Sequence, residues 1–374
     1  MAASDDGPAA ASSHTVRSGI QRLQFASDLT FQKALTRRVD EYFATTGRRR
    51  RDCWQLYLKT AIILVCFVTL YWLLVFVAWT LWQGLALTAA LGLVTAAIGF
   101  NIQHDGGHQS YSDRRWVNRL MAWTMDLIGS SSYRWHWKHS VIHHMYVNIS
   151  GYDGDMYMGP LGRLAPHQPR RWYHRWQHLY LWPIYGLIAF KMQLVDDFRF
   201  IFTGRLDQHR IPRPTRGALL TFLAGRAAFA AWAFVIPSLW HPFGVVLFFY
   251  FIGTVVLGTT VVLVFMIPHL QAEADFPLPR PGTEAMASSW AVHQARVTVD
   301  FARGNRFLTW FIGGLNYHKE HHLFPLICHI NYPHIAPLVE QTCREFGLPY
   351  NSYPSFAAGI VAHYRWLRRM GRGD

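Results

Sequence analysis

Four long apolar stretches dominate the hydropathy pattern of this chain. They cover, approximately, residues 57–80, 84–103, 217–238 and 243–267. A helix rises 1.5 Å per residue, so about 20 apolar residues are enough to cross the hydrocarbon core of a bilayer. Two short turns, Leu81–Gln83 and about 239–242, join the stretches in pairs. The pattern predicts four transmembrane helices in two hairpins.

Segments outside these stretches have weaker patterns. Two apolar pieces, 121–131 and 179–193, fall below spanning length and are typical of interfacial or re-entrant segments. Residues 23–46 carry apolar side chains at helical spacing, which predicts an amphipathic helix that lies on a membrane surface or packs against protein. The predicted organisation is a disordered tail (1–22), a cytoplasmic amphipathic segment (23–53), a first hairpin (54–103), a cap segment (104–216), a second hairpin (217–268) and a second cap segment (269–374).

Composition and charge support a membrane protein. The chain is 51% hydrophobic and only 16% charged, against roughly 25% charged residues in soluble proteins. Its formal charge of +14 would also suit a nucleic-acid-binding protein, but the basic residues gather in the segments between hairpins. Nine lie before residue 56, fifteen in 104–216 and ten after 268, while the two hairpin turns carry none. By the positive-inside rule, both termini and the cap face the cytoplasm, and nucleic acid is not an expected partner.

Two basic residues, Lys59 and Arg226, fall within the apolar stretches. A charge inside a span costs at least about 2.5 kcal/mol on insertion scales. We therefore expect Arg226 to face a neighbouring helix or to extend towards the interface. The four cysteines form no CxxC pair, so neither a disulfide framework nor a thiolate zinc site is expected.

Histidines are frequent, with 20 in 374 residues, and nine of them fall in four groups, of which two directly follow the second and fourth apolar stretches. Spacings of three and four residues place side chains on one face of a helix. The predicted metal ligands are His104, His108, His139, His143, His144, His269, His318, His321 and His322. All nine lie on the predicted cytoplasmic side, so the imidazoles can converge beneath one membrane face.

Nine imidazoles exceed the needs of a single zinc ion, which takes four ligands, or three at a catalytic site. Two metal ions with four or five nitrogen ligands each account for them. A redox-active pair of metal ions that reacts with dioxygen indicates non-haem iron. Nearby carboxylates would orient the rings by accepting from the second ring nitrogen. The candidates for this supporting role are Asp105, Asp153, Asp155 and Glu320. The other eleven histidines need no metal, although His136 and His293 lie close to these motifs.

Other catalytic motifs are missing from the sequence. It contains no HExxH zinc-protease motif, no P-loop or GxGxxG nucleotide motif, and no GxSxG nucleophile motif.

At these histidines the sequence resembles the membrane fatty acid desaturases, in particular the bacterial acyl-lipid or linoleoyl-CoA desaturase-like branch related to front-end desaturases. The resemblance covers about nine-tenths of the chain. Its motifs are ALTRRVDEYF from residue 34, HDGGHQSYS at 104–112, HHMYVNISGYDGD at 143–155, PHLQAEADFP at 268–277, GGLNYHKEHHLFPLICHINYPHIAPLV at 313–339, and FGLPYNSYPSF near the C-terminus.

The resemblance implies that eight of the nine histidines, all except His318, bind a di-iron centre. His318 stands where front-end members usually have glutamine and stearoyl-CoA type desaturases have histidine, which strengthens it as a ninth ligand and weakens any inference of front-end regiochemistry. Ser140 replaces a common asparagine. Asn148 falls at the family's Thr-Asn pair, with Val147 replacing the threonine, and is a further supporting candidate.

The expected activity is dioxygen-dependent insertion of a cis double bond into an acyl chain carried by a lipid, CoA or carrier protein. About 53 residues precede the first apolar stretch and no His-Pro-Gly-Gly haem motif occurs, so electrons are expected from a separate ferredoxin or cytochrome b5. A hydroxylase on the same scaffold is the first alternative, and a catalytically silent metal-binding adaptor is the second. The expected location is the bacterial inner membrane, as a multi-pass protein with a cytoplasmic active site.

Overall fold

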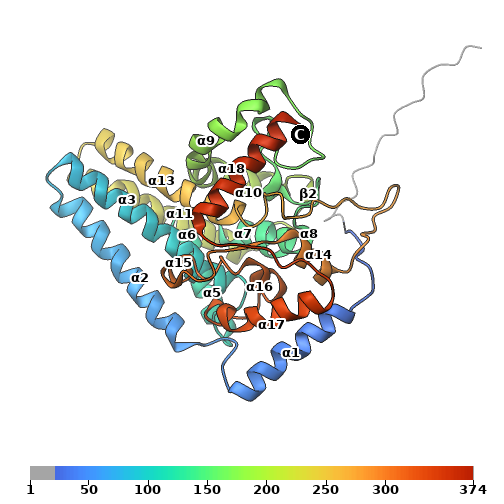
Figure 1. The fold of residues 1–374 in the computed structure, drawn as a ribbon. Coiled ribbons are helices and arrows are strands. Elements are labelled where there is room, and N and C mark those ends of the chain that lie inside the picture. Colours follow the sequence, from blue (N-terminus) through green and yellow to red (C-terminus); the bar gives the residue numbers. More distant parts are fainter. Residues whose placement is uncertain (1–21, 374) are drawn as a thin grey trace, which may run out of the picture.

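The computed structural model describes residues 22–373 and is mostly helical (Figure 1). Within these residues, four helices are long and apolar enough to cross a membrane: Trp54–Val77, Leu81–Gly107, Arg216–Ser238 and Phe243–Met266. Each overlaps one predicted apolar stretch, so the four predicted spanning segments are present as helices. Residues 1–21 of the predicted disordered tail lie outside the described part of the chain.

Three of the four spanning segments contain a π-helical turn. The first is α2 (Trp54–Trp72) with η1 (Leu73–Val77), and the fourth is the uninterrupted α13 (Phe243–Met266). The second is α3 (Leu81–Ile98), η2 (Gly99–Gln103) and α4 (His104–Gly107), and the third is α11 (Arg216–Ala230), η8 (Ala231–Val235) and α12 (Ile236–Ser238). π-Helical turns are rare in proteins, and those that occur often lie at functional sites. In the second span, η2 directly precedes the first two clustered histidines.

The elements between the second and third spans and after the fourth are mostly short helices, and we refer to them together as the cap. Its first part contains α5 (Arg115–Ala122), α6 (Thr124–Leu127), α7 (Ser132–Trp135), the π-helix η3 (His136–His143), α8 (His144–Tyr146), η4 (Gly154–Met156), η5 (Gly159–Leu161), η6 (Trp172–Trp176), α9 (Gln177–Lys191), η7 (Met192–Asp196) and α10 (Asp197–Thr203). Its second part contains α14 (Trp290–Val297), α15 (Arg306–Phe311), α16 (His318–Leu323), η9 (His329–Asn331), α17 (Tyr332–Glu345) and α18 (Phe356–Arg372). Strands are minor: β1 (Arg205–Leu206) pairs antiparallel with β2 (His209–Arg210), and β3 (Asp300–Phe301) pairs parallel with β4 (Ser352–Tyr353).

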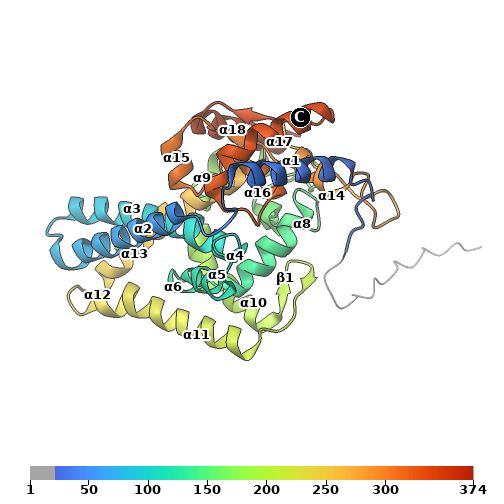
Figure 2. The same cartoon turned by 90° about the horizontal axis from the view of Figure 1, so that it is seen from below.

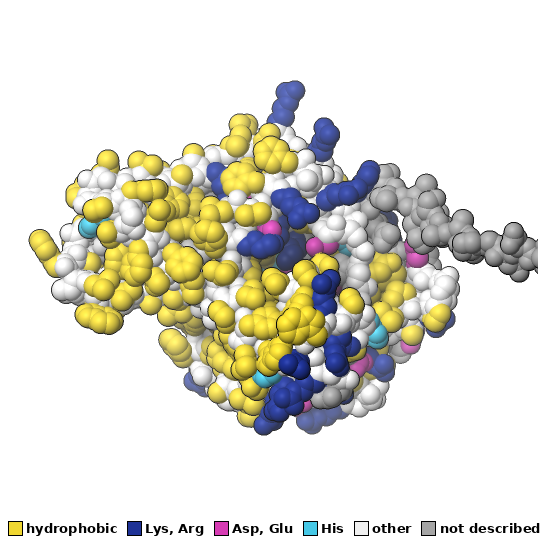
Figure 3. All heavy atoms as spheres, turned by 90° about the horizontal axis from the view of Figure 1, so that it is seen from above, with side chains coloured by type: hydrophobic (Ala, Val, Ile, Leu, Met, Phe, Trp, Pro, Cys, Tyr) yellow, Lys and Arg dark blue, Asp and Glu magenta, His cyan; other side chains and the backbone are white. Residues whose placement is uncertain are grey.

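Helix α3 packs between α2 and α13, and α13 also packs along α9. The crossing of α9 and α13 is close because two glycines meet there: a Cβ atom added to Gly258 would lie 2.5 Å from the carbonyl oxygen of Gly186. In Figure 2, α2, α3 and α13 project to one side of the cap, whereas α11 runs beneath the cap and packs against α6. Hydrophobic side chains cover this projecting part, whereas Lys and Arg gather on the cap (Figure 3). The surface therefore has the apolar and charged halves of a membrane-embedded protein.

The N-terminal helix α1 (Thr30–Thr46) begins later than the predicted amphipathic segment, at Thr30 instead of near Leu23. Residues before it form an isolated bridge between Gln24 and Ala285. The apolar face of α1 is buried against the cap, mainly against α17. The structure therefore favours the second interpretation of this segment, in which its apolar face packs against protein.

Arg226 turns towards the cap from the third span. It forms an ion pair with Asp197 and donates a hydrogen bond to the carbonyl of Gln193 at 2.8 Å. Arg134 reaches the same Asp197 carboxylate at 3.3 Å. Arg226 therefore faces a protein partner, as its position predicted, and links α11 to the cap.

Candidate metal centre

The structure brings all nine predicted ligands into one buried cluster. His104 and His108 come from the end of the second span, and His269 comes from the segment just after α13. The π-helix η3 supplies His139 and His143, α8 supplies His144, and α16 supplies His318, His321 and His322. None of the nine is more than 6% exposed. Four segments far apart in sequence thus meet beneath the spanning helices.

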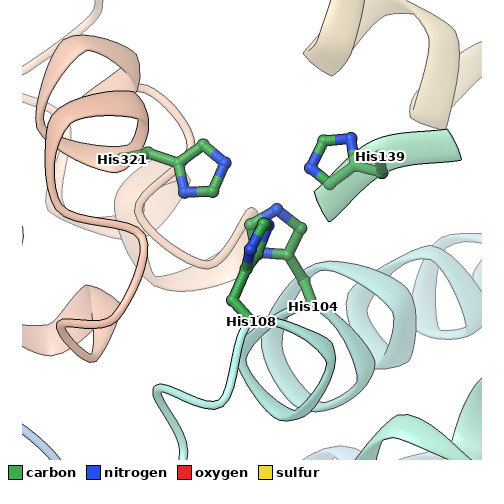
Figure 4. A group of neighbouring side chains, drawn as sticks. All are labelled: His104, His108, His139 and His321. Atoms are coloured by element: carbon green, nitrogen blue, oxygen red, sulfur yellow. The ribbon is translucent and has the colours of Figure 1, made fainter. Parts of the chain in front are cut away.

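One group within the cluster consists of His104, His108, His139 and His321 (Figure 4). Each offers a ring nitrogen, and these nitrogens lie within 4.8 Å of one another. The rings of His104 and His321 are 4.5 Å apart between centroids, and those of His108 and His139 are 5.2 Å apart. In Figure 4 the four rings converge on a common space from three different parts of the chain.

A second group consists of His143, His269, His318 and His322. Nε2 of His318 lies 2.8 Å from Nε2 of His269 and 3.2 Å from Nε2 of His322. Two nitrogens that each sit about 2.1 Å from one metal ion at a right angle are themselves about 3 Å apart. The Nε2 atoms of this group therefore have the spacing of neighbouring ligands on one ion.

His144 lies between the two groups. Its ring is 4.3 Å from that of His322 and 4.6 Å from that of His321. One nitrogen of His144 and one from each of these two rings lie within 4.8 Å of one another. The cluster is therefore continuous, and the spacing of each group is compatible with metal binding.

The outer ring nitrogens of several cluster histidines are held by protein groups. Nδ1 of His318 lies 3.0 Å from the carbonyl oxygen of Leu315, and Nδ1 of His143 lies 3.1 Å from Asp153. Such contacts fix the tautomer and aim Nε2 in the opposite direction. Consistent with this, the Nε2 atoms of His104, His108, His139, His143, His144 and His321 are buried without a hydrogen-bond partner. Buried polar atoms are normally satisfied, so inward-facing bare nitrogens fit bound metal ions.

Burial also keeps most of these imidazoles neutral. It lowers the pKa well below the usual value for His108, His139, His144, His269, His318, His321 and His322, with neighbouring histidines adding to the shift. His143 differs: burial opposes its charged form, but the Asp153 carboxylate outweighs burial and raises its pKa. Metal ions bind neutral imidazole, so the cluster does not need to lose many protons before binding.

Among the predicted supporting residues, Asp153, Asp155 and Asn148 lie beside the cluster. The Asp153 carboxylate accepts from the backbone N–H of Asn148 at 3.1 Å as well as facing His143. Asp155 pairs with Lys138 and lies 3.6 Å from His143. The Asn148 amide donates to the carbonyl oxygen of His269 at 3.0 Å, so it holds a ligand's backbone instead of a ring.

The other two carboxylates have partners outside the nine clustered histidines. Asp105 lies 3.9 Å from His104 and closer, at 2.9 Å, to His329. Glu320 accepts a hydrogen bond from Tyr350 at 2.7 Å and contacts no clustered imidazole among the described residues. The helical geometry of α16 explains this difference, because Glu320 projects away from the face shared by His318, His321 and His322.

Several residues that the sequence did not point to contact the cluster, among them Tyr332, whose hydroxyl lies 3.3 Å from Nδ1 of His321, and Gln294. Gln294 on α14 is fully buried, its Oε1 lies 3.0 Å from Nδ1 of His322, and its amide donates to the carbonyl oxygen of His144 at 2.9 Å. Its neighbour His293 faces away, with Nε2 2.9 Å from the carbonyl oxygen of Val147. In the sequence, this region was indicated only by the adjacent His293, which was named above as lying close to the histidine motifs.

Replacing Gln294 by leucine is expected to weaken metal binding by about 10- to 100-fold, because His322 loses the group that orients it. The measurement is competition for the metal against a chelator in purified protein. Gln294→Glu keeps an acceptor for His322 and should retain most of the affinity. Equal losses in both variants would argue against an orienting role.

Comparisons with known proteins agree with this geometry. A family model described as fatty acid desaturase matches residues 80–354. The sn-1 linoleoyl-lipid 6-desaturase of Arthrospira platensis is 39% identical, over 93% of this chain and 95% of its own. The enzyme of the same name from Synechocystis sp. is 34% identical, over 95% and 99%. The acyl-lipid (8-3)-desaturase of Physcomitrium patens is also 34% identical, over 92% and 72%. The chain therefore belongs to the fatty acid desaturase family, and is an oxidoreductase with histidine clusters compatible with metal binding.

Proposed function

We propose that this protein is an acyl-lipid desaturase that uses two iron ions, dioxygen and two electrons to insert a cis double bond. The observation that carries the proposal is the convergence of nine imidazoles into two connected groups. The names of the relatives support a lipid-linked acyl chain as the substrate. In the balanced reaction, a –CH2–CH2– unit, dioxygen, two electrons and two protons give –CH=CH– and two water molecules.

Iron held by the two groups would supply the oxidation of an unactivated methylene, and the protein would do the rest. His104, His108, His139 and His321 would hold one ion, and His143, His269, His318 and His322 the other, with His144 joining either. Asp153 and Gln294 would fix His143 and His322 in orientation. Burial of the whole cluster would exclude bulk water from the reacting carbons.

The spanning helices offer a place for the acyl chain. A cavity of about 360 Å³ lies between α2, α3, η8 and α13, within the range of small-molecule sites. Its lining is mainly apolar and includes Leu74, Leu91, Phe229, Ala233, Phe249 and Leu257. Ile128 and Gln193 of the cap also line it. We propose that this cavity receives part of the acyl chain while the reacting carbons face the metals.

Enlarging Ala233 to phenylalanine should shift product formation towards shorter acyl chains, because the ring would fill part of the cavity. Comparing product yields across a series of lipid chain lengths measures this shift. Val235→Phe is the matched control, since Val235 lies on the same π-helical turn but is 58% exposed. An unchanged chain-length profile in Ala233→Phe would argue against this cavity as the acyl site.

The topology proposed with this function places the cap, both termini and the metal centre in the cytoplasm of a bacterial cell, at the inner membrane. A soluble carrier, ferredoxin or cytochrome b5, would then reach the cap with electrons. The distribution of basic residues supports this orientation.

The proposed cofactor is tested by metal analysis of the purified protein. We expect close to two iron ions per chain and loss of turnover when a chelator removes them. A preparation that contains only zinc and still desaturates lipid would refute the di-iron proposal.

A further inference from the structure

Lys59 is a charged residue inside the first spanning helix whose side chain is buried within the protein. Only 2% of Lys59 is exposed, and its Nζ atom lies 2.9 Å from Nε2 of His329 on η9. The ring of Trp310 lies 5.3 Å from the same ammonium group. Ionisable residues at membrane depth are costly, and those that occur usually pair with a partner and serve a function. Neither Lys59 nor His329 was among the predicted site residues.

Contacts continue from His329 towards the metal centre. Nδ1 of His329 lies 2.9 Å from Oδ2 of Asp105, and its backbone N–H donates to the same oxygen at 3.4 Å. The other oxygen of Asp105 lies 3.9 Å from Nδ1 of His104. These three side chains are at most 3% exposed. A buried chain of side-chain contacts therefore leads from the ammonium group of Lys59 on α2, through His329 and Asp105, to His104 in the first group of histidines.

With Lys59 charged, one arrangement of protons satisfies these contacts. An ammonium group can only donate, so Nε2 of His329 accepts and the ring proton sits on Nδ1, where it is donated to Asp105. The second oxygen of Asp105 faces Nδ1 of His104, which favours the proton on that nitrogen. Nε2 of His104 is then the free nitrogen, and it is the buried atom without a partner.

Asp105, Cys328 and His329 offer ligand atoms within 4.8 Å of one another. These three residues are nevertheless not a further metal site. Both ring nitrogens of His329 already face partners, Lys59 and Asp105. Burial also raises the pKa of the Cys328 thiol well above its usual value, so the sulfur is not a ready thiolate ligand.

We infer that Lys59 and His329 are positioning residues that act through Asp105 on His104. His329 holds the carboxylate in place, and Lys59 balances its negative charge from within the membrane-spanning helix. The inference rests on the metal centre proposed above and adds two residues to its support. It also gives the buried lysine an electrostatic role, because a nearby positive charge favours the lower oxidation state of a bound metal.

The test uses full-length purified protein with two readouts: affinity for iron(II) by chelator competition, and the midpoint potential of the iron-loaded form. His329→Leu should weaken binding by about 10- to 100-fold, and His329→Gln, whose amide can still donate to Asp105, should lose less. Lys59→Met should make the potential more negative. In the double variant Lys59→Met with His329→Leu, the effects on the potential should not add, because both act through one carboxylate.

His174→Gln is the matched control, since His174 is 2% exposed and its Nε2 is 2.9 Å from the carbonyl oxygen of Pro160, outside the cluster. It should keep the wild-type affinity and potential. Wild-type values in folded Lys59→Met and His329→Leu, or strictly additive effects, would overturn the inference. A wild-type protein that binds no iron would instead refute the proposed metal centre.

Discussion

Replacing His321 by alanine is expected to abolish desaturation and to lower metal affinity by more than about 100-fold. His321 belongs to two of the ligand groups, one with His104, His108 and His139 and one with His144 and His322. Its loss would remove a ligand from the ion that it would hold with His104, His108 and His139, and loss of a directly binding ligand should cost more than the 10- to 100-fold typical of a supporting residue. Metal content and lipid products of the purified variant measure the two effects.

His209→Gln provides the control for this prediction. His209 is fully buried, and its Nε2 lies 2.9 Å from the carbonyl oxygen of Tyr152, away from the cluster. A general cost of replacing a buried histidine would appear in both variants. Full metal content in folded His321→Ala would remove this residue from the ligand set.

Acid is expected to destabilise the metal-free protein strongly. The seven histidines with lowered pKa values titrate near 6.5 in an unfolded chain, so below that pH the unfolded state binds more protons than the folded state. Stability then falls with pH, by about 1.4 kcal/mol per pH unit for each such group, until the folded-state pKa is reached. His143, whose pKa is raised, contributes in the opposite direction.

The measurement is the melting temperature of metal-free protein between pH 7.5 and 5.5. We expect it to fall over this range, because several groups together approach the roughly 5–15 kcal/mol of a typical domain. Replacing His321 and His322 together by glutamine should make the decline less steep. A melting temperature that is constant or rises towards pH 5.5 would contradict the expectation.

The spanning helices and the histidines could be predicted because their signals are local. Each apolar stretch is continuous in sequence, and the structure has a helix over each one. His318, His321 and His322 share a helix face through spacing alone, and His104 and His269 follow spans that end on the same side. Such short-range patterns specify which side chains can meet before any tertiary contact is known.

The supporting contacts could not be predicted because they join residues distant in sequence. Gln294 reaches His322 from a separate helix, and Lys59 reaches His329 across most of the chain. Glu320 shows the opposite error: its place between ligands suggested an orienting role, yet its side chain meets Tyr350. Proximity in sequence to a ligand does not determine which way a side chain points on a helix.

Mass spectrometry of membrane lipids from cells that express the wild-type protein or His321→Ala tests the desaturase activity itself. We expect acyl chains lighter by 2 mass units, with one new double bond at a defined position, in wild-type cells alone. Chains heavier by 16 mass units without that loss would show a hydroxylase. Identical lipids in both strains, with iron bound to the wild-type protein, would contradict the proposed desaturase activity.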